Sequence, residues 1–302
     1  MPHRSSPARL LAIGLCIVAI GACSSPEPVD EGAGGTVPAT ARPPATATPG
    51  TTTPPGGTQL TIGLLVPTSG ELASLGGPLE QTVESAIADI NDAGGGNGAP
   101  VLLVTADEGP TPESAEEGFA ELLEAGADVV IGPAPSSRVR ALPGDLAAAR
   151  GPGCSGAATA ADLATLDTGR TFFRTAPSDE YQAAALASLL DQDGHRRVAV
   201  IARGDDYGVG FSQRLGAALD RRGIEVTAQV AYDPDADDVS AEVTEARDSN
   251  PAAVAVIGRL DDGSKVLAEL AAQGSGPSAL PTYASDALQD PGLGALVDPE
   301  NP

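Results

Sequence analysis

From residue 60 onward, short apolar runs alternate with longer amphipathic segments. The runs at 60–66, 101–105 and 129–132 are rich in Val, Ile and Leu, which predicts buried strands. Between them, apolar residues recur three or four positions apart, which predicts helices. The apolar face of the first predicted helix comprises Leu79, Val83, Ala86, Ile87 and Ile90, and that of the second comprises Ala115, Phe119, Leu122 and Leu123.

The alternation resumes after residues 175–178. Ser178 is placed to cap a helix that carries Asp179 and Glu180 in its first turn. That helix is expected to bury Leu186, Leu189 and Leu190. Further strands are predicted at 198–201, 224–231, 252–257 and 281–284, with helices at 211–222, 239–249 and 265–273. Such alternation predicts an α/β fold of two doubly wound parallel-sheet lobes joined near residue 176, with a ligand crevice at the facing strand ends.

The N-terminus has a different pattern. Arg4 and Arg9 precede an apolar run at 10–22, and small residues lead directly to Cys23. This is the pattern of a secretory signal, and the run is too short to span a bilayer comfortably. Cysteine at the cleavage point resembles a bacterial lipoprotein lipobox, so we expect Cys23 to carry acyl chains that anchor the protein to a membrane. The alternative is a plain signal peptide in which Cys23 is incidental.

The segment after Cys23 consists mainly of Pro, Thr, Gly, Ala and Ser up to residue 58. Such a composition buries too little apolar surface to fold, and proline keeps it extended. The predicted organisation is therefore a signal peptide at 1–22, a lipidated cysteine and tether at 23–58, an N-terminal lobe at 59–176 and a second lobe at 177–302.

Charge and residue usage exclude several functions. The chain has 41 acidic and 17 basic residues, a net charge of −24, which opposes binding to nucleic acid or to anionic lipid. Beyond Cys23 only Cys154 and His195 remain of their types, so neither an internal disulfide nor a His/Cys metal cage can form. Cys154 is expected to be a small buried apolar residue.

Catalytic and cofactor motifs are not found. The segment 153–156 lacks the spacing of a nucleophile elbow, and 208–210 lacks the third glycine of a dinucleotide fingerprint. The chain's one lysine, Lys265, is not preceded by the glycine that a phosphate-binding loop requires. The acid pairs at 205–206 and 261–262 are typical of solvated loops. We therefore expect a protein that is not an enzyme and needs no cofactor.

Several short motifs, in order along the chain, carry a family resemblance. They are 62–70, 88–91, 130–137, 157–159, 173–179 and 206–210. Together they resemble the leucine/isoleucine/valine-binding proteins of ABC importers, which have the type I periplasmic-binding fold. The resemblance covers about Leu60 to Asp286. It implies a protein that captures an amino acid, branched-chain or a related small carboxylate or amide, and delivers it to a membrane permease.

The resemblance also implies where the ligand's α-carboxylate and backbone contacts lie. Ser136 and Thr159 fall where the family binds the carboxylate, and Ala157 would offer its carbonyl to the ammonium. A position for Ser136 at a helix start agrees, since N–H groups there favour an anion. The alternative is that Ser136 only caps the helix.

Three further positions follow from the resemblance. Asp286 falls where the family places an acidic partner for the ammonium, and Tyr207 would close the pocket from the second lobe. The alternatives are that Asp286 caps a helix and that Tyr207 is an exposed loop residue. Leu75 stands where many relatives have an aromatic ring, so the specificity for the ligand side chain is expected to differ.

The function expected from these features is that of a lipid-anchored, extracytoplasmic binding protein for an ABC importer. The alternative is a ligand-sensing or degenerate binding protein without a transport role. The family continues beyond the position of Asp286, whereas this sequence ends at Pro302. We expect a C-terminally short fold that comes from a truncated gene, a fragment or a smaller variant.

Overall fold

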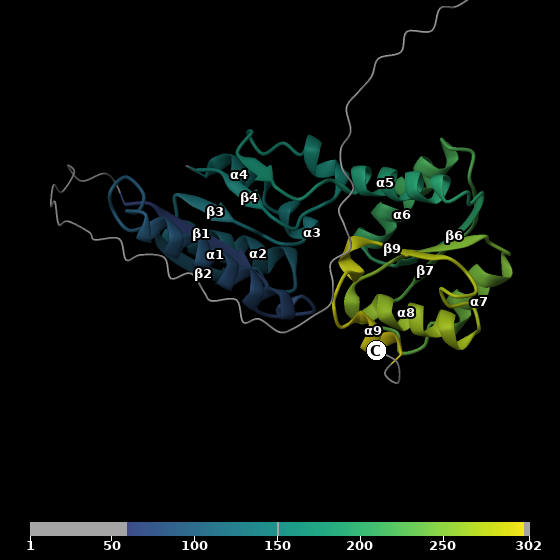
Figure 1. The fold of residues 1–302 in the computed structure, drawn as a ribbon. Coiled ribbons are helices and arrows are strands. Elements are labelled where there is room, and N and C mark those ends of the chain that lie inside the picture. The colour runs from purple at the N-terminus through teal and green to yellow at the C-terminus, as the bar shows by residue number, and fades with distance from the viewer. Residues whose placement is uncertain (1–58, 150, 299–302) are drawn as a thin grey trace, which may run out of the picture. The chain divides into compact units, whose positions relative to one another are not determined.

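A computed structural model describes residues 59–149 and 151–298 of the protein (Figure 1). The predicted signal peptide, Cys23 and tether lie outside these residues. Within the described part, all strand pairs of the two sheets are parallel, and helices connect the strands. The predicted α/β class is therefore confirmed. No helix of this part is long and apolar enough to cross a membrane.

The first sheet is five-stranded, in the order β2-β1-β3-β4-β5. Its strands are β1 (Thr61–Val66), β2 (Leu102–Asp107), β3 (Val129–Ile131), β4 (Gly153–Ser155) and β5 (Phe172–Arg174). Its helices are η1 (Ala73–Leu75), α1 (Gly76–Asp92), α2 (Pro112–Glu124), α3 (Ser136–Val139), α4 (Pro143–Ala148) and η2 (Ala161–Thr165). We call these elements the first lobe.

The second sheet is four-stranded, in the order β7-β6-β8-β9. Its strands are β6 (Arg197–Arg203), β7 (Glu225–Tyr232), β8 (Ala253–Ile257) and β9 (Thr282–Ala284). Its helices are α5 (Asp179–Gln192), α6 (Asp206–Asp220), α7 (Ser240–Asp248), α8 (Leu260–Ala272), η3 (Asp286–Leu288) and α9 (Leu293–Val297). We call these elements the second lobe.

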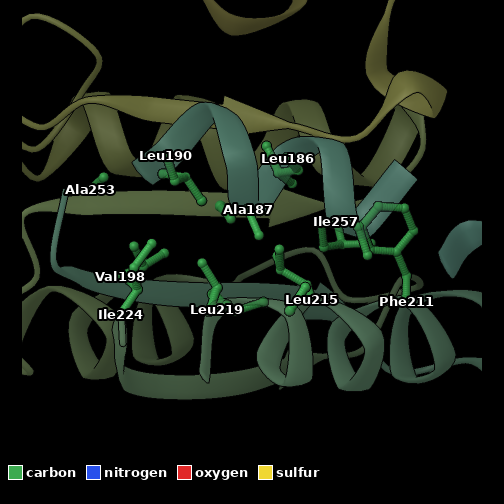
Figure 2. Close-up of a cluster of buried hydrophobic side chains, with 14 of the residues drawn as sticks. Leu186, Ala187, Leu190, Val198, Phe211, Leu215, Leu219, Ile224, Ala253 and Ile257 are labelled. Carbon is green, nitrogen blue, oxygen red and sulfur yellow. The ribbon is translucent and has the colours of Figure 1, made fainter. Parts of the chain in front are cut away.

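The second sheet is buried on both faces. Along β6, Val198 and Val200 pack with α5 and α6, whereas the alternate residues Ala199 and Ile201 pack with α7 and α8. Figure 2 shows side chains of α5 and α6 meeting those of β6 and β8 on the first of these faces. This arrangement is the doubly wound one that the continuous apolar runs predict.

The core of the first sheet is smaller. Side chains of β1, β2 and β3 pack there against α2 and α4, and the largest of them, Phe119, is 1% exposed. Gly132, directly after β3, has a φ of 108°, and an added Cβ would collide with the Leu65 carbonyl. The close approach of the β3 end to β1 therefore requires glycine.

Local sequence signals explain some helix starts, because the N-cap side chains of α2, α5 and α6 accept hydrogen bonds from the first turn. The Ser178 side chain accepts a hydrogen bond from the Glu180 N–H and caps α5, as predicted. The prediction that Leu189 is buried is wrong, because its side chain is 46% exposed, and Ile90 and Leu123 on the predicted apolar faces are 42% and 38% exposed. Each helix contacts its sheet along one stripe, and these three lie at the stripe's edge.

Candidate functional site

The loops at the carboxyl ends of the two sheets contact each other through ion pairs. Glu71, which follows β1, accepts hydrogen bonds from Arg203 at the end of β6 and from Arg259 after β8, each at 2.7 Å. Elsewhere between the lobes, Arg140 Nη1 lies 3.0 Å from an Asp206 carboxylate oxygen. Strand ends of this type are where open parallel sheets bind ligands.

A cavity of about 270 Å³ lies among these loops. We call it the interlobe cavity, because both lobes line it. Its lining residues are Ser69, Glu71, Leu72, Glu108, Gly109, Pro110, Pro135, Ser137, Arg138, Asp205, Asp206 and Arg259. The Arg259 guanidinium also lies 5.9 Å from the centre of the Tyr207 ring, so Tyr207 is a neighbour of this cavity.

Ser136 connects two loops of the first lobe. It is the first residue of α3, and its hydroxyl accepts a hydrogen bond from the Ala160 N–H at 3.0 Å. The N-cap is Pro135, which has extended backbone and no side-chain hydrogen bond. The prediction that Ser136 caps the helix is therefore wrong, and its hydroxyl hydrogen is free for another acceptor.

The loop with Ala157 and Thr159 is organised by Ser155. This serine is fully buried, donates to the Pro133 carbonyl at 2.7 Å and accepts from the Ala158 N–H at 3.0 Å. Ala157 is exposed, and the Thr159 carbonyl accepts from the Asp179 N–H at 2.9 Å. The loop that follows β4 is thus tied to β3 on one side and to α5 on the other.

Tyr207, Asp286 and Asp179 come together near this loop. The Tyr207 hydroxyl is buried and has no hydrogen-bond partner among the described residues, although Ser285 lies beside it. Burial raises the pKa of Tyr207, the interaction with the Ser285 side chain lowers it, and the charges of Asp286 and Asp179 raise it further. Burial also raises the pKa of Asp179, and the Asp286 charge adds to that effect. The site therefore combines two acids with an unpaired hydroxyl.

The two remaining predicted positions differ in how the structure places them. Asp286 is exposed at the start of η3, whose N-cap is Ser285, so Asp286 does not cap that helix. Leu75 is 45% exposed at the end of η1 and does not line the interlobe cavity, whereas Leu72 does. A contact between Leu75 and a ligand stays a prediction.

A family model described as periplasmic binding protein matches residues 59–299. The chain belongs to the periplasmic binding protein family. The matched region contains both lobes and every residue of the site described above. The family resemblance identified from the sequence motifs is therefore confirmed.

Two relatives illustrate this family. One is the chemotactic signal transduction system substrate-binding protein BasB of Halobacterium salinarum, 31% identical over 71% of this chain and 53% of BasB. Another is the Leu/Ile/Val-binding protein BraC3 of Rhizobium johnstonii, 30% identical over 61% of this chain and 50% of BraC3. The chain thus spans about half the length of these relatives. Both are named as binding proteins rather than enzymes, in agreement with the sequence prediction.

Two solved structures of substrate-binding proteins have a similar fold. The branched-chain amino acid substrate-binding protein LivJ of Streptococcus pneumoniae, in complex with isoleucine, has a TM-score of 0.71 at 21% identity, covering 80% of this chain and 68% of LivJ. A solute-binding protein of R. palustris in complex with 4-hydroxybenzoate also has a TM-score of 0.71, at 17% identity, and the match covers 80% of this chain and 66% of that protein. These similarities confirm the type I periplasmic-binding fold.

A buried ion cluster in this periplasmic binding protein was missed by sequence reasoning. Arg203 is fully buried and forms ion pairs with Glu71, Asp205 and Asp262, and Tyr232 donates a hydrogen bond to Asp262. The prediction of solvated acid pairs is wrong for Asp262, which is 5% exposed because it neutralises this arginine. Burial opposes ionisation of Glu71, but the two arginines hold its pKa below the usual value.

The described residues offer no metal centre. No group of three or more His, Cys, Asp or Glu side chains is arranged to hold a metal ion in residues 59–149 and 151–298. Cys154 is a free thiol that is half-buried, not buried as predicted, and His195 contacts the Tyr283 ring edge-on at 5.7 Å. Neither residue belongs to the site between the lobes.

Proposed function

We propose that this protein captures an amino acid, or a related small carboxylate or amide, between its two lobes and delivers it to the permease of an ABC importer. The observation that carries the proposal is the buried Tyr207 hydroxyl without a partner, next to Asp179 and Asp286. A buried hydroxyl without a hydrogen bond is costly, so a ligand that supplies one is favoured.

The carboxylate of the ligand would be held by the first lobe. Ser136 already accepts a hydrogen bond from Ala160, so its own O–H is oriented to donate elsewhere. Thr159 supplies a second hydroxyl, which also interacts with the Asp179 carboxylate. Helix α3 has only four residues, so these hydroxyls matter more for binding an anion than the helix end does. Isoleucine and 4-hydroxybenzoate, the ligands of the two structural neighbours, both carry a carboxylate.

The ammonium of the ligand would be held by the second lobe and the segment that joins it. Asp286 and Asp179 repel each other, and a cation between them removes that repulsion. Tyr207 and the Ala157 carbonyl supply further acceptors. Because both lobes contribute contacts, the ligand favours the closed arrangement over an open one.

The N-terminal organisation completes the proposal. A signal peptide at 1–22 is removed, Cys23 is acylated and residues 24–58 tether the lobes, 59–176 and 177–302, to the outer face of the membrane. Mass spectrometry of the N-terminal peptide should find a diacylated or triacylated Cys23, and Cys23→Ser should release the protein into the aqueous phase. An unmodified mature N-terminus elsewhere would contradict this anchoring.

The binding proposal is tested by calorimetric titration of the full-length chain with the twenty amino acids, short amides and urea. One of these ligands should bind with a 1:1 ratio. Combined Ser136→Ala and Thr159→Val changes should weaken that binding at least about tenfold, a loss of about 1.4 kcal/mol. Ser278→Ala, at an exposed position, is the control and should bind as the wild type does. No binding by any of these compounds would refute the proposal.

A second candidate function is ligand sensing without transport. It is favoured by the name of BasB, a substrate-binding protein of a chemotactic signalling system. Ligand uptake by cells that lack the protein distinguishes the two functions. Uptake falls if the protein serves a permease and stays unchanged if it serves a receptor.

A further inference from the structure

More acidic than basic residues line the interlobe cavity. Four of its lining residues carry carboxyl groups, namely Glu71, Glu108, Asp205 and Asp206, and two carry guanidinium groups, namely Arg138 and Arg259. Only Leu72 and two prolines present apolar side chains. A branched aliphatic group placed here would bury carboxyl groups without providing hydrogen-bond donors, which is unfavourable.

The positive charges of the cavity are already engaged by the protein. Arg138 donates to the carbonyls of Gly109 and Pro110 and to the Ser137 hydroxyl. Arg259 donates to Glu71 at 2.7 Å, and its other terminal nitrogen lies 3.7 Å from Asp205. Both guanidinium groups are therefore fixed on protein acceptors rather than free for an anionic ligand.

The free hydrogen-bonding capacity of the cavity consists of acceptors. Glu108 is 1% exposed, and in the described chain only the Ala134 N–H donates to its carboxyl group, at 2.7 Å on Oε2. Burial raises the pKa of Glu108 to about 7 although the Arg138 charge opposes this rise, so the carboxyl is mainly an acceptor above that pH. Glu71 binds both of its arginines through Oε1, which leaves Oε2, on a side chain that is 57% exposed, without a donor among the described residues. The cavity therefore lacks a hydrogen-bond donor for these carboxyl oxygens, and a positively charged donor would also balance the negative charge of the acids.

The cavity adjoins the site proposed for the amino-acid head group. Ser137 lines the cavity and follows Ser136, Asp206 lines it and precedes Tyr207, and Arg259 contacts both the cavity and the Tyr207 ring. A ligand held at Ser136 and Tyr207 would therefore extend its side chain toward Glu108.

We infer that the interlobe cavity receives the ligand's side chain and selects an amino acid whose side chain ends in a cationic nitrogen, an ammonium or a guanidinium. This inference rests on the proposed function and narrows its substrate class. The cationic group donates hydrogen bonds to the free carboxyl oxygens of Glu108 and Glu71, which an aliphatic side chain cannot do. The chain therefore departs from the branched-chain ligands named for several of its relatives.

The test uses ligand pairs that differ only at the side-chain terminus. Lysine and norleucine share a four-carbon stem, and arginine and citrulline differ in the charge of the terminal group. In calorimetric titrations of the full-length chain, lysine or arginine should bind at least about tenfold more tightly than its uncharged partner, because hydrogen bonds to charged groups are the stronger ones.

Glu108→Gln should lower the ratio of the affinity for the cationic amino acid to that for its uncharged partner at least about threefold. The reason is that the change removes one negative charge at nearly constant side-chain volume. The matched control is Glu116→Gln, on the exposed side of α2, which should leave the ratio unchanged. If circular dichroism shows that Glu108→Gln does not fold, Asp206→Asn takes its place, with the same expected direction. A ratio that neither Glu108→Gln nor Asp206→Asn lowers would overturn the inference.

The two proposals fail in different ways. Binding of norleucine or leucine as tight as that of lysine and arginine would overturn the cationic subsite and leave amino-acid capture standing. Binding of no amino acid would overturn both. Tight binding of lysine or arginine with a weaker uncharged partner supports both.

Discussion

Replacement of Tyr207 by Phe separates the hydroxyl's role in binding from any role in folding. The hydroxyl is buried and unpaired, and burial raises its pKa. Loss of a buried, unpaired polar group relieves about 1 kcal/mol or more of desolvation cost. For a chain of this size, 1 kcal/mol corresponds to a change in Tm of about 2–4 °C. Tyr207→Phe without ligand should therefore melt at the wild-type temperature or about 3 °C above it.

With ligand, the same variant should show the opposite effect. Loss of one hydrogen bond to the ligand costs about 1 kcal/mol, which weakens binding about fivefold. The assay is thermal unfolding with and without a saturating amino acid, combined with calorimetric titration. Tyr181→Phe, at a side chain 73% exposed, is the control. A variant that melts lower than wild type by about 2 °C or more, with unchanged affinity, would show that Ser285 satisfies the hydroxyl and would refute this reasoning.

Three further predictions concern stability and closure. Burial raises the pKa of Glu108 from 4.5 to about 7, so the carboxyl ionises in the unfolded state first and the free energy of unfolding falls as the pH rises across that interval. This fall amounts to up to about 3 kcal/mol. Glu108→Gln should remove it when urea unfolding at about pH 5 is compared with urea unfolding at about pH 8. An equal fall in the variant would refute this assignment. Glu71→Gln should weaken ligand binding about threefold at low salt and less at high salt, because high salt screens the partly exposed ion pairs that Glu71 forms between the lobes. Calorimetry that finds no change in affinity at low salt would refute this prediction. Phe119→Ala should destabilise the protein by about 3–5 kcal/mol in urea unfolding, whereas Phe173→Ala, at a side chain 56% exposed, should cost less than about 1 kcal/mol; equal costs would contradict the described core.

The fold could be predicted because its strands are buried on both faces. Segments such as 253–257 are apolar at every position, and all five of these residues are buried. Helix starts such as Ser178 carry their own capping signal. These properties are local, so a single sequence shows them. The exposure of Leu189 could not be predicted in the same way, because it depends on where α5 contacts its neighbours.

The site was only partly predictable. Ser136, Thr159 and Tyr207 were predicted from motif positions, and the structure places Tyr207 and Asp286 near Asp179, which lies next to Thr159. Asp179 was interpreted only as an acid in the first turn of a helix. Its neighbour Asp286 comes from a distant part of the chain, so no local pattern shows the pairing.

The buried cluster of Arg203 could not be found from local patterns either. An arginine at a strand end followed by two acids normally indicates a solvated loop. Its burial depends on Tyr232 at the end of β7, on Asp262 in the first turn of α8 and on Glu71 from the first lobe. A signal was present in the sequence, because Arg203 directly continues the apolar run of β6.

Recognition of both the carboxylate and the ammonium of an amino acid is the central claim, and one titration series tests it directly. The full-length chain is titrated with its best-bound amino acid, with the amine that lacks its carboxylate and with the acid that lacks its α-ammonium. The account predicts that each deletion weakens binding at least about a hundredfold, because it removes a charged ligand group together with its hydrogen bonds to the protein. Binding of either analogue as tight as that of the amino acid would contradict the account.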